Sequence, residues 1–143
     1  MTGRTVVERG RRKAYRPLSP ADRQTAFRAG LAAYDRRDFF LAHELLEPAW
    51  MGSDDPAERA LYSGLIKLAA AGVHGARGNP KGVVTNLTGA RDRLAALVDG
   101  ELEPGPEADR IDLPALVAAI DDRLVAEAIQ PSSADSPAIP RRS

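Results

Sequence analysis

The strongest constraint on the fold is a helix-start pattern that recurs along the chain. In this pattern a residue with a short polar side chain caps the helix, and proline occupies one of the first helical positions. It occurs at Ser19-Pro20, Asp55-Pro56 and Asn79-Pro80, and again at Asp112 with Pro114. Because proline lacks an N–H, it is tolerated at a helix start but disrupts a helix interior. The pattern therefore predicts where separate helices begin.

Apolar residues recur at helical spacing after each start. The spacing predicts helices at about 20–36, 39–50 and 56–77, a fourth from 80 towards Gly100, and a fifth that begins at 112–114. The third is apolar nearly all round, which is typical of a central, buried helix. No segment shows convincing strand alternation. The expected fold class is all-α, an antiparallel bundle of four to five helices around a central buried helix.

A chain of 143 residues is expected to form one domain, here residues 19–130. Residues 1–18 are expected to be a flexible basic tail, since they carry six cationic residues against Glu8 alone. A nucleic-acid or partner-binding arm is the alternative for this tail, but the segment has no matching aromatic or helical surface, which argues against a nucleic-acid partner. Residues 131–143 are rich in Ser, Pro and Ala, and we expect a disordered tail there.

The composition also limits chemistry and location. There is no cysteine, which excludes disulfides, thiol nucleophiles and cysteine metal sites. No apolar run approaches the roughly 20 residues that a membrane span needs, and no hydrophobic segment follows the basic N-terminus. We therefore expect a cytoplasmic protein without a membrane partner, and leave open whether it forms a homo-oligomer.

The candidate site begins in the segment from Phe39 to Trp50, which holds the only tryptophan and one of two histidines. On a helix with about 100° per residue, Glu47 follows His43 by one turn and Trp50 follows it by two. Phe39 falls on the same arc, so these residues are expected to point towards the core. A carboxylate in an apolar place is costly unless it is paired or binds a cation. The segment therefore predicts a buried His/Glu/Trp cluster.

A divalent metal is one candidate occupant of this cluster. His43 and Glu47 can both reach one ion, His74 of the third helix is a third candidate ligand, and Glu44 is a fourth. Nitrogen and carboxylate ligands suit Zn, Mn, Fe or Ni. Lys67 opposes this hypothesis, because it shares a helical line with His74 and carries positive charge.

A pocket is expected beside the cluster. Ser63, Lys67, Ala70 and His74 share one line along the third helix, and a line with little bulk can border a pocket. The residues expected to line it are Trp50, Lys67, Phe39, Tyr62, Arg77 and Asn79.

The pattern His43-x-x-x-Glu47-x-x-Trp50 resembles the signature of domain of unknown function 309, a family of small bacterial and archaeal helical proteins. Gly64-Leu65-Ile66-x-Leu68-Ala69 is similar to the family's next helix, and its later marks are similar to His74, Gly78-Asn79 and Gly82. The resemblance covers about residues 26–97 and implies an all-α bundle of unestablished function, for which metal binding by the histidine and glutamate has been suggested. Two positions depart from the pattern: Lys67 replaces an expected glutamine, and Val83 replaces an alanine.

Four functions stay open for the cluster. It is a structural polar network, a metal site, an enzyme site, or part of a helical module that binds a peptide or protein through an aromatic groove. The run from His43 to Glu47 is similar to the zinc-protease helix motif with its second histidine replaced by glutamate. That replacement and the missing third ligand argue against a protease. Whether the protein is an enzyme, and which residues are catalytic, is not determined by the sequence.

Overall fold

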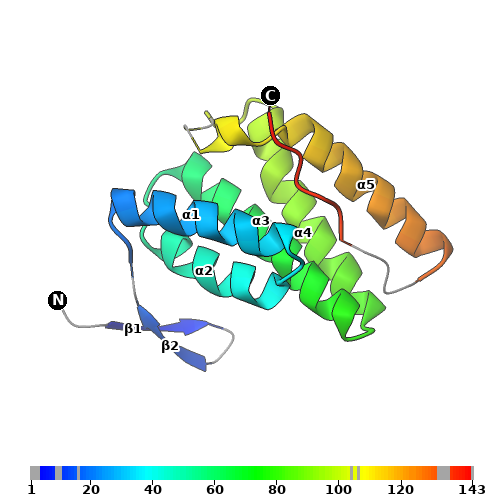
Figure 1. The fold of residues 1–143 in the computed structure, drawn as a ribbon, viewed down its shortest axis with the longest axis horizontal. Helices are drawn as coiled ribbons and strands as arrows, with labels where there is room; N and C mark the ends of the chain where they lie inside the picture. The colour runs from blue at the N-terminus through cyan, green and yellow to red at the C-terminus, as the bar shows by residue number, and fades with distance from the viewer. Residues whose placement is uncertain are drawn as a thin grey trace.

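The computed structural model describes residues 4–8, 11–15, 17–103, 105, 107–131 and 136–142. Within these described residues, two short strands precede five α-helices, with one 3-10 helix before the last α-helix (Figure 1). In chain order the elements are β1 (Arg4–Glu8), β2 (Arg11–Tyr15), α1 (Pro20–Asp35), α2 (Phe39–Met51), α3 (Pro56–Ala76), α4 (Pro80–Val98), η1 (Ala108–Arg110) and α5 (Leu113–Ile129).

Each α-helix begins at a capping residue, and the cap-and-proline pattern of the sequence predicts four of the five. A side-chain oxygen of the capping residue accepts a hydrogen bond from the backbone N–H three positions later, at 2.9 to 3.3 Å. A cap of this kind stabilises a helix by about 1 kcal/mol. The capping residues are Ser19, Asp38, Asp55, Asn79 and Asp112.

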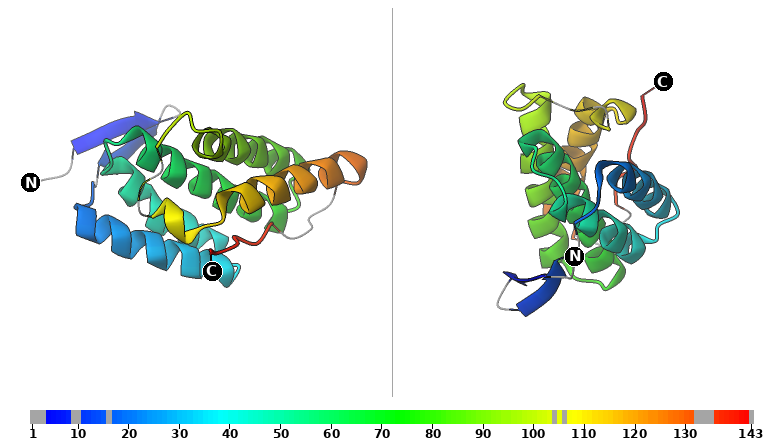
Figure 2. Two further views of the ribbon diagram at one scale, coloured as in Figure 1. Left: turned by 90° about the horizontal axis from the view of Figure 1, so that it is seen from above. Right: turned by 90° about the vertical axis from the view of Figure 1, so that its left-hand side faces the viewer.

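The helices form the expected all-α bundle, in which consecutive helices pack against each other (Figures 1 and 2). The links from α1 to α2, α2 to α3 and α3 to α4 are only a few residues long, which makes packed neighbours antiparallel. α3 lies between α2 and α4, so the predicted central helix is confirmed. No helix among the described residues combines the length and apolarity needed to cross a membrane.

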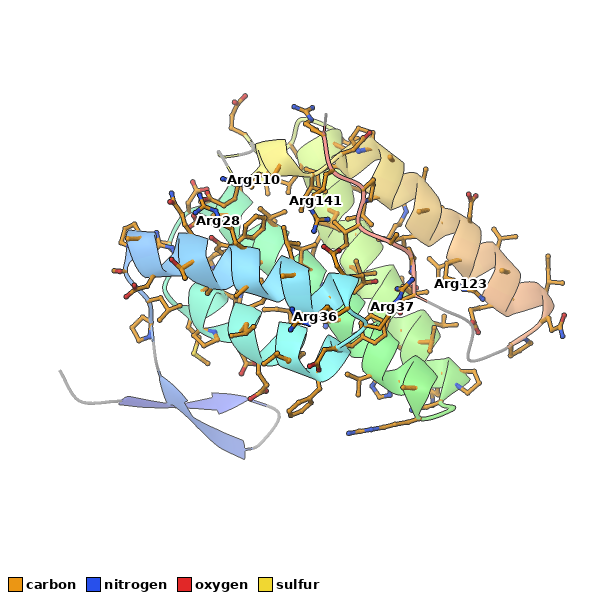
Figure 3. All side chains as sticks on the ribbon, in the orientation of Figure 1. Arg28, Arg36, Arg37, Arg110, Arg123 and Arg141 are labelled. Atoms are coloured by element: carbon orange, nitrogen blue, oxygen red, sulfur yellow. The ribbon has the colours of Figure 1, made fainter. Side chains whose placement is uncertain are left out.

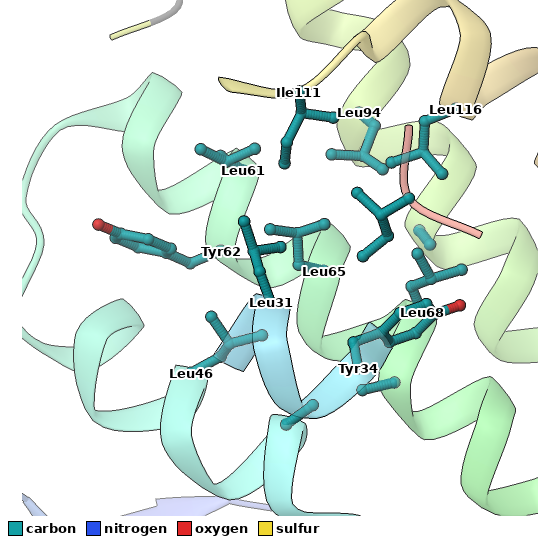
Figure 4. Close-up of a cluster of buried hydrophobic side chains, with 14 of the residues drawn as sticks. Leu31, Tyr34, Leu46, Leu61, Tyr62, Leu65, Leu68, Leu94, Ile111 and Leu116 are labelled. Atoms are coloured by element: carbon teal, nitrogen blue, oxygen red, sulfur yellow. The ribbon is translucent and has the colours of Figure 1, made fainter. Parts of the chain in front are cut away.

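Leucine side chains from successive helices meet in the core around α3 (Figure 4). Leu31 of α1 and Leu46 of α2 pack with Leu65 and Leu68 of α3, and all four are buried. Full burial of one such side chain contributes about 1.5–3 kcal/mol. α2 and α3 also approach each other closely at Gly72, where a Cβ atom would overlap the Phe39 ring. The contacts between these buried side chains of α1, α2 and α3 therefore fix how the three helices pack.

At the N-terminus the structure differs from the expectation of no strand. β1 and β2 pair antiparallel, from Arg4 opposite Tyr15 to Glu8 opposite Arg11. The run from Thr5 to Val7 consists of β-branched residues, which favour a strand. The run is too short for a strand pattern to be recognised in the sequence. The expected flexibility of this tail stays a prediction, and residues 1–3, 9, 10 and 16 lie outside the described residues.

At the C-terminus the expectation of disorder is wrong for residues 136–142. The Tyr34 hydroxyl donates to the carbonyl of Pro137 at 2.6 Å, and Ile111 forms a β-bridge with Arg141. Ile139 packs into the core with 6% of its surface exposed. In a segment rich in Ser and Pro, the single residue Ile139 does not stand out as a core residue. Residues 132–135 and 143, also expected to be disordered, lie outside the described residues.

Candidate functional site

A cleft of about 470 Å³ opens between α2, α3 and α4, and we call it the charged cleft. It holds most of the residues that the sequence singled out, including the motif residues of α2. Phe40 stands at its edge with 62% of its surface exposed. The full lining consists of Phe40, His43, Glu44, Glu47, Trp50, Ser63, Ile66, Lys67, Ala70, Val73, His74, Arg77, Asn86 and Arg93.

The motif residues of α2 lie beside the core rather than in it. Ala42, Leu46 and Ala49 are the buried residues of this helix. His43 and Glu47 fall on the flank of that stripe and are only half-buried, the His43 side chain being 28% exposed. The expectation of a buried cluster is therefore wrong. The two alanines mark the true core line, and their small side chains give a weak hydrophobic signal beside the large aromatics.

α3 contributes the wall that its spacing predicted. Ser63, Lys67, Ala70 and His74 all line the charged cleft. Ile66 and Val73 add apolar surface between them, and Arg77 lies just beyond the end of the helix. The lining residues of α3 thus alternate between polar and apolar groups along its length.

α4 supplies two lining residues that sequence reasoning missed, Asn86 and Arg93. A signal for them exists, because Gly82, Asn86, Gly89 and Arg93 recur at helical spacing away from the apolar stripe of α4. That line of small and polar residues faces α3. A Cβ atom at Gly89 would come within 2.5 Å of Lys67 Cδ.

The charges in the cleft separate by helix. The aliphatic stem of Lys67 lies against α4, where Arg93 Nη1 donates to the carbonyl of Gly89 at 3.0 Å. These two cations and Arg77 lie on α3, α4 and the residue after α3, whereas both carboxylates, Glu44 and Glu47, lie on α2. The charged cleft therefore has an acidic wall and a basic wall.

His74 is oriented by the cap of the next helix. Asn79 Oδ1 accepts from the Gly82 N–H at 3.3 Å, so its amide nitrogen faces His74 Nδ1 at 3.0 Å. This arrangement makes Nδ1 an acceptor, and the neutral ring then carries its proton on Nε2. A metal-bound histidine instead donates its second ring N–H to an acceptor. Asn79 presents a donor there, so His74 suits an anion or hydrogen-bond acceptor better than a metal.

The proposed metal ligands do not form one cluster. His43 Nδ1 lies 3.8 Å from Glu44 Oε2, on the same helix. Across the described part of the chain, no three His, Asp or Glu side chains are grouped closely enough to hold a metal ion. His43, Glu47 and His74 therefore line one cleft without converging on a common point.

Trp50 is held at the cleft by Arg59. The Arg59 guanidinium lies 4.5 Å from the centroid of the indole ring and donates to the carbonyls of Trp50 and Ser53 at 3.1 and 3.0 Å. A cation over the face of tryptophan is attracted by the ring quadrupole. These contacts cover one face of Trp50 and fix its position.

Two of the expected pocket aromatics belong to the core instead. Phe39 packs edge-on against Tyr34, with ring centroids 5.0 Å apart. Tyr62 is fully buried beside Phe27, and burial raises the pKa of its hydroxyl, an effect that the nearby Glu58 carboxylate reinforces. Asn79 does not line the cleft, but it acts on it by orienting His74.

Comparison with known families agrees with the resemblance seen in the motif. Residues 27–86 match a family model described as "Domain of unknown function (DUF309)". The chain resembles the DUF309 family. No curated protein and no solved structure matches it.

The DUF309 match covers most of the charged cleft. It spans the whole of α2 and α3, which carry the acidic wall and most of the basic wall. It ends at Asn86, so Arg93 lies beyond the DUF309 region although it lines the same cleft.

Proposed function

We propose that this protein is a helical binding module, and that the charged cleft holds a peptide segment with charges of both signs. The observation that carries the proposal is the separation of charge between the walls. Two carboxylates on α2 share the cleft with three cations on the α3 and α4 side. Complementary charges give a binding site its specificity and fix the register of its ligand.

The dimensions of the cleft favour an elongated ligand. Its lining extends along α3 from Ser63 to Arg77, a length of about 21 Å at the helical rise of 1.5 Å per residue. A volume of about 470 Å³ spread over that length describes a shallow groove rather than a compact chamber. An extended peptide rises about 3.3 Å per residue, so about six residues span the groove.

The contacts available in the cleft assign a place to each part of such a peptide. A Lys or Arg of the peptide pairs with Glu44 or Glu47, while an Asp or Glu pairs with Lys67 or Arg93. Ile66, Ala70 and Val73 offer apolar surface to the side chains between them. The Nε2–H of His74 is a further donor for a peptide carbonyl.

A divalent transition metal on His43 and Glu47 is the second candidate. These two side chains lie one helical turn apart and line the same cleft. Such a site has few protein ligands, with water or a bound peptide completing the coordination. It predicts stabilisation by metal alone, which the peptide hypothesis does not.

Selection from a random library of displayed eight-residue peptides tests the first candidate. We expect enriched sequences to carry one basic and one acidic residue several positions apart. Fluorescence anisotropy of one enriched peptide then compares Glu47→Lys and Lys67→Glu with the wild type. Reversing the matching charge in the peptide should restore binding to the variant. Glu101→Lys and Lys81→Glu change the same charges at exposed positions outside the cleft and should bind normally.

A parallel melting experiment separates the two candidates. Zn²⁺, Mn²⁺, Fe²⁺ or Ni²⁺ is added to chelator-treated wild type and to the double variant His43→Leu/Glu47→Leu. A rise in melting temperature that is confined to the wild type favours the metal site, because only a ligand of the folded state stabilises it. Peptides enriched without any charge preference would contradict the peptide-binding proposal.

A further inference from the structure

A second hollow, of about 380 Å³, opens between α1, η1 and the C-terminal segment 136–142, on another part of the surface. Its lining consists of Arg28, Leu31, Ala32, Asp35, Arg110, Arg141 and Arg142. Four of these residues are arginines and only one is acidic, so this hollow differs from the two-signed cleft. We call it the arginine hollow. Figure 3 shows Arg28, Arg110 and Arg141 on one face of the molecule.

Backbone pairing brings these arginines together from distant parts of the chain. The Arg142 N–H donates to the carbonyl of Arg110 at 3.1 Å, and the Asp112 N–H donates to the carbonyl of Pro140 at 3.0 Å. These bonds hold the C-terminal segment against η1. The segment is also tied to α1, since Arg141 Nη2 lies 2.7 Å from Asp35 Oδ2. The positions of the arginines are therefore set by the bonds that join the C-terminal segment to η1 and α1.

The charge in the hollow is only partly balanced. Asp35 pairs with Arg141, and Arg141 Nη1 also donates to the carbonyl of Ile139 at 2.6 Å. The side chains of Arg28 and Arg110 make no hydrogen bond or ion pair with any described residue. Like charges held close together lower stability, and a protein commonly keeps such an arrangement where binding needs it.

We infer that the arginine hollow is a second binding site, for a compact ligand that carries two or more adjacent phosphate groups. The planar guanidinium presents paired N–H donors that match two phosphate oxygens, and it stays charged at all physiological pH values. The size of the hollow suits a di- or triphosphate group. No aromatic side chain of the described residues lines it, and proteins that bind single-stranded nucleic acids use aromatic side chains to stack bases. The phosphates, rather than a base, are therefore recognised.

Isothermal titration of the full chain with sodium tripolyphosphate tests this inference. The variant Arg28→Gln/Arg110→Gln should bind about tenfold more weakly or worse, because charge-assisted hydrogen bonds to phosphate are lost. Arg36→Gln/Lys81→Gln removes the same charge from exposed residues that do not line the hollow, and should bind within about twofold of the wild type. ATP, which carries the same triphosphate, should bind about as tightly as tripolyphosphate.

Several results would overturn the site. One is the absence of tripolyphosphate binding at millimolar concentration, and another is equal weakening in both double variants, which would indicate nonspecific attraction. Binding of ATP without tripolyphosphate would mean that the nucleoside is recognised instead. A 20-base-pair RNA duplex that binds more tightly than tripolyphosphate, and weakens equally in both double variants, would indicate an extended polyanion surface. Melting of both variants without ligand checks that each is folded.

Discussion

The two sides of α3 show different solutions to packing. On the core side, Leu65 and Leu68 are buried among apolar side chains, and Gly72 lets the Phe39 ring approach the helix backbone. On the cleft side, Ile66 and Lys67 are only partly covered. The core side is fixed by close contact, so almost any change of volume is felt there. The lining residues on the cleft side are only partly covered, so a change of volume there removes fewer contacts.

The sharpest test of this comparison uses the neighbours Leu65 and Ile66. Leu65→Ala should lower the free energy of unfolding by about 2–5 kcal/mol, because it removes buried surface and leaves a cavity. Ile66→Ala should cost less than half as much, since Ile66 lines the open cleft. Urea denaturation followed by circular dichroism measures both. Equal losses would mean that the cleft side is packed as tightly as the core.

Two glycines provide the next test. Gly72→Ala places a methyl group against the Phe39 ring, and overpacking of this kind costs about 1–3 kcal/mol. Gly89→Ala meets the flexible stem of Lys67, which can move aside, so helix propensity should dominate. Alanine is favoured over glycine in a helix by about 1 kcal/mol. Gly89→Ala should therefore leave stability unchanged or raise it, as the shift in urea midpoint will show.

The core side of this comparison could be predicted from the sequence to a large extent. The caps at Ser19, Asp55 and Asn79 placed the helix starts, because a cap and a proline act locally. The C-terminal segment was different. Its order depends on the Tyr34 hydroxyl bond, the buried Ile139 side chain and the backbone bonds to residues 110–112. All of these are long-range contacts that local composition does not reveal.

The two buried tyrosines differ in whether their hydroxyl groups have a hydrogen-bond partner. The Tyr34 hydroxyl donates to the Pro137 carbonyl, whereas the Tyr62 hydroxyl has no hydrogen-bond partner among the described residues. Tyr34→Phe should therefore cost about 1–2 kcal/mol by leaving that carbonyl without its donor. Tyr62→Phe should be neutral or slightly stabilising. Urea unfolding of both variants at neutral pH measures the difference, and the reverse order would contradict it.

Alkaline pH should weaken the same core. Burial raises the pKa of both Tyr34 and Tyr62 above the ordinary value of about 10. The folded state therefore keeps these protons more tightly than the unfolded state does. Their contribution to stability is complete below about pH 10 and is lost as the pH rises further. In urea titrations between pH 8 and 11, the double variant Tyr34→Phe/Tyr62→Phe should lose less stability than the wild type, and parallel pH profiles would refute this.

Only part of the lining of the charged cleft was predictable from the sequence, and its degree of burial was not. Helical spacing correctly grouped Lys67 with His74, because that grouping depends only on the period of one helix. The burial of His43 depends on which side of α2 meets the core, and the small alanines on that side gave too little signal. Arg93 was missed because it comes from a helix that the motif does not touch.

The smallest effect is expected at His43, where the cleft differs most from the sequence-based hypothesis. If His43 and Glu47 formed a buried ion pair, His43→Ala would cost about 3–5 kcal/mol by leaving a carboxylate alone in the core. Both side chains are instead half-buried in an open cleft, and the 3.8 Å approach to Glu44 is a surface contact. Pairs of that kind contribute about 0–1 kcal/mol, so the variant should unfold within about 1 kcal/mol of the wild type. Leu46→Ala, one turn along on the core line of the same helix, is the matched control and should cost about 2–5 kcal/mol. A loss at His43 as large as the loss at Leu46 would place the motif in the core. A small loss leaves binding, rather than stability, as the property that the histidine serves.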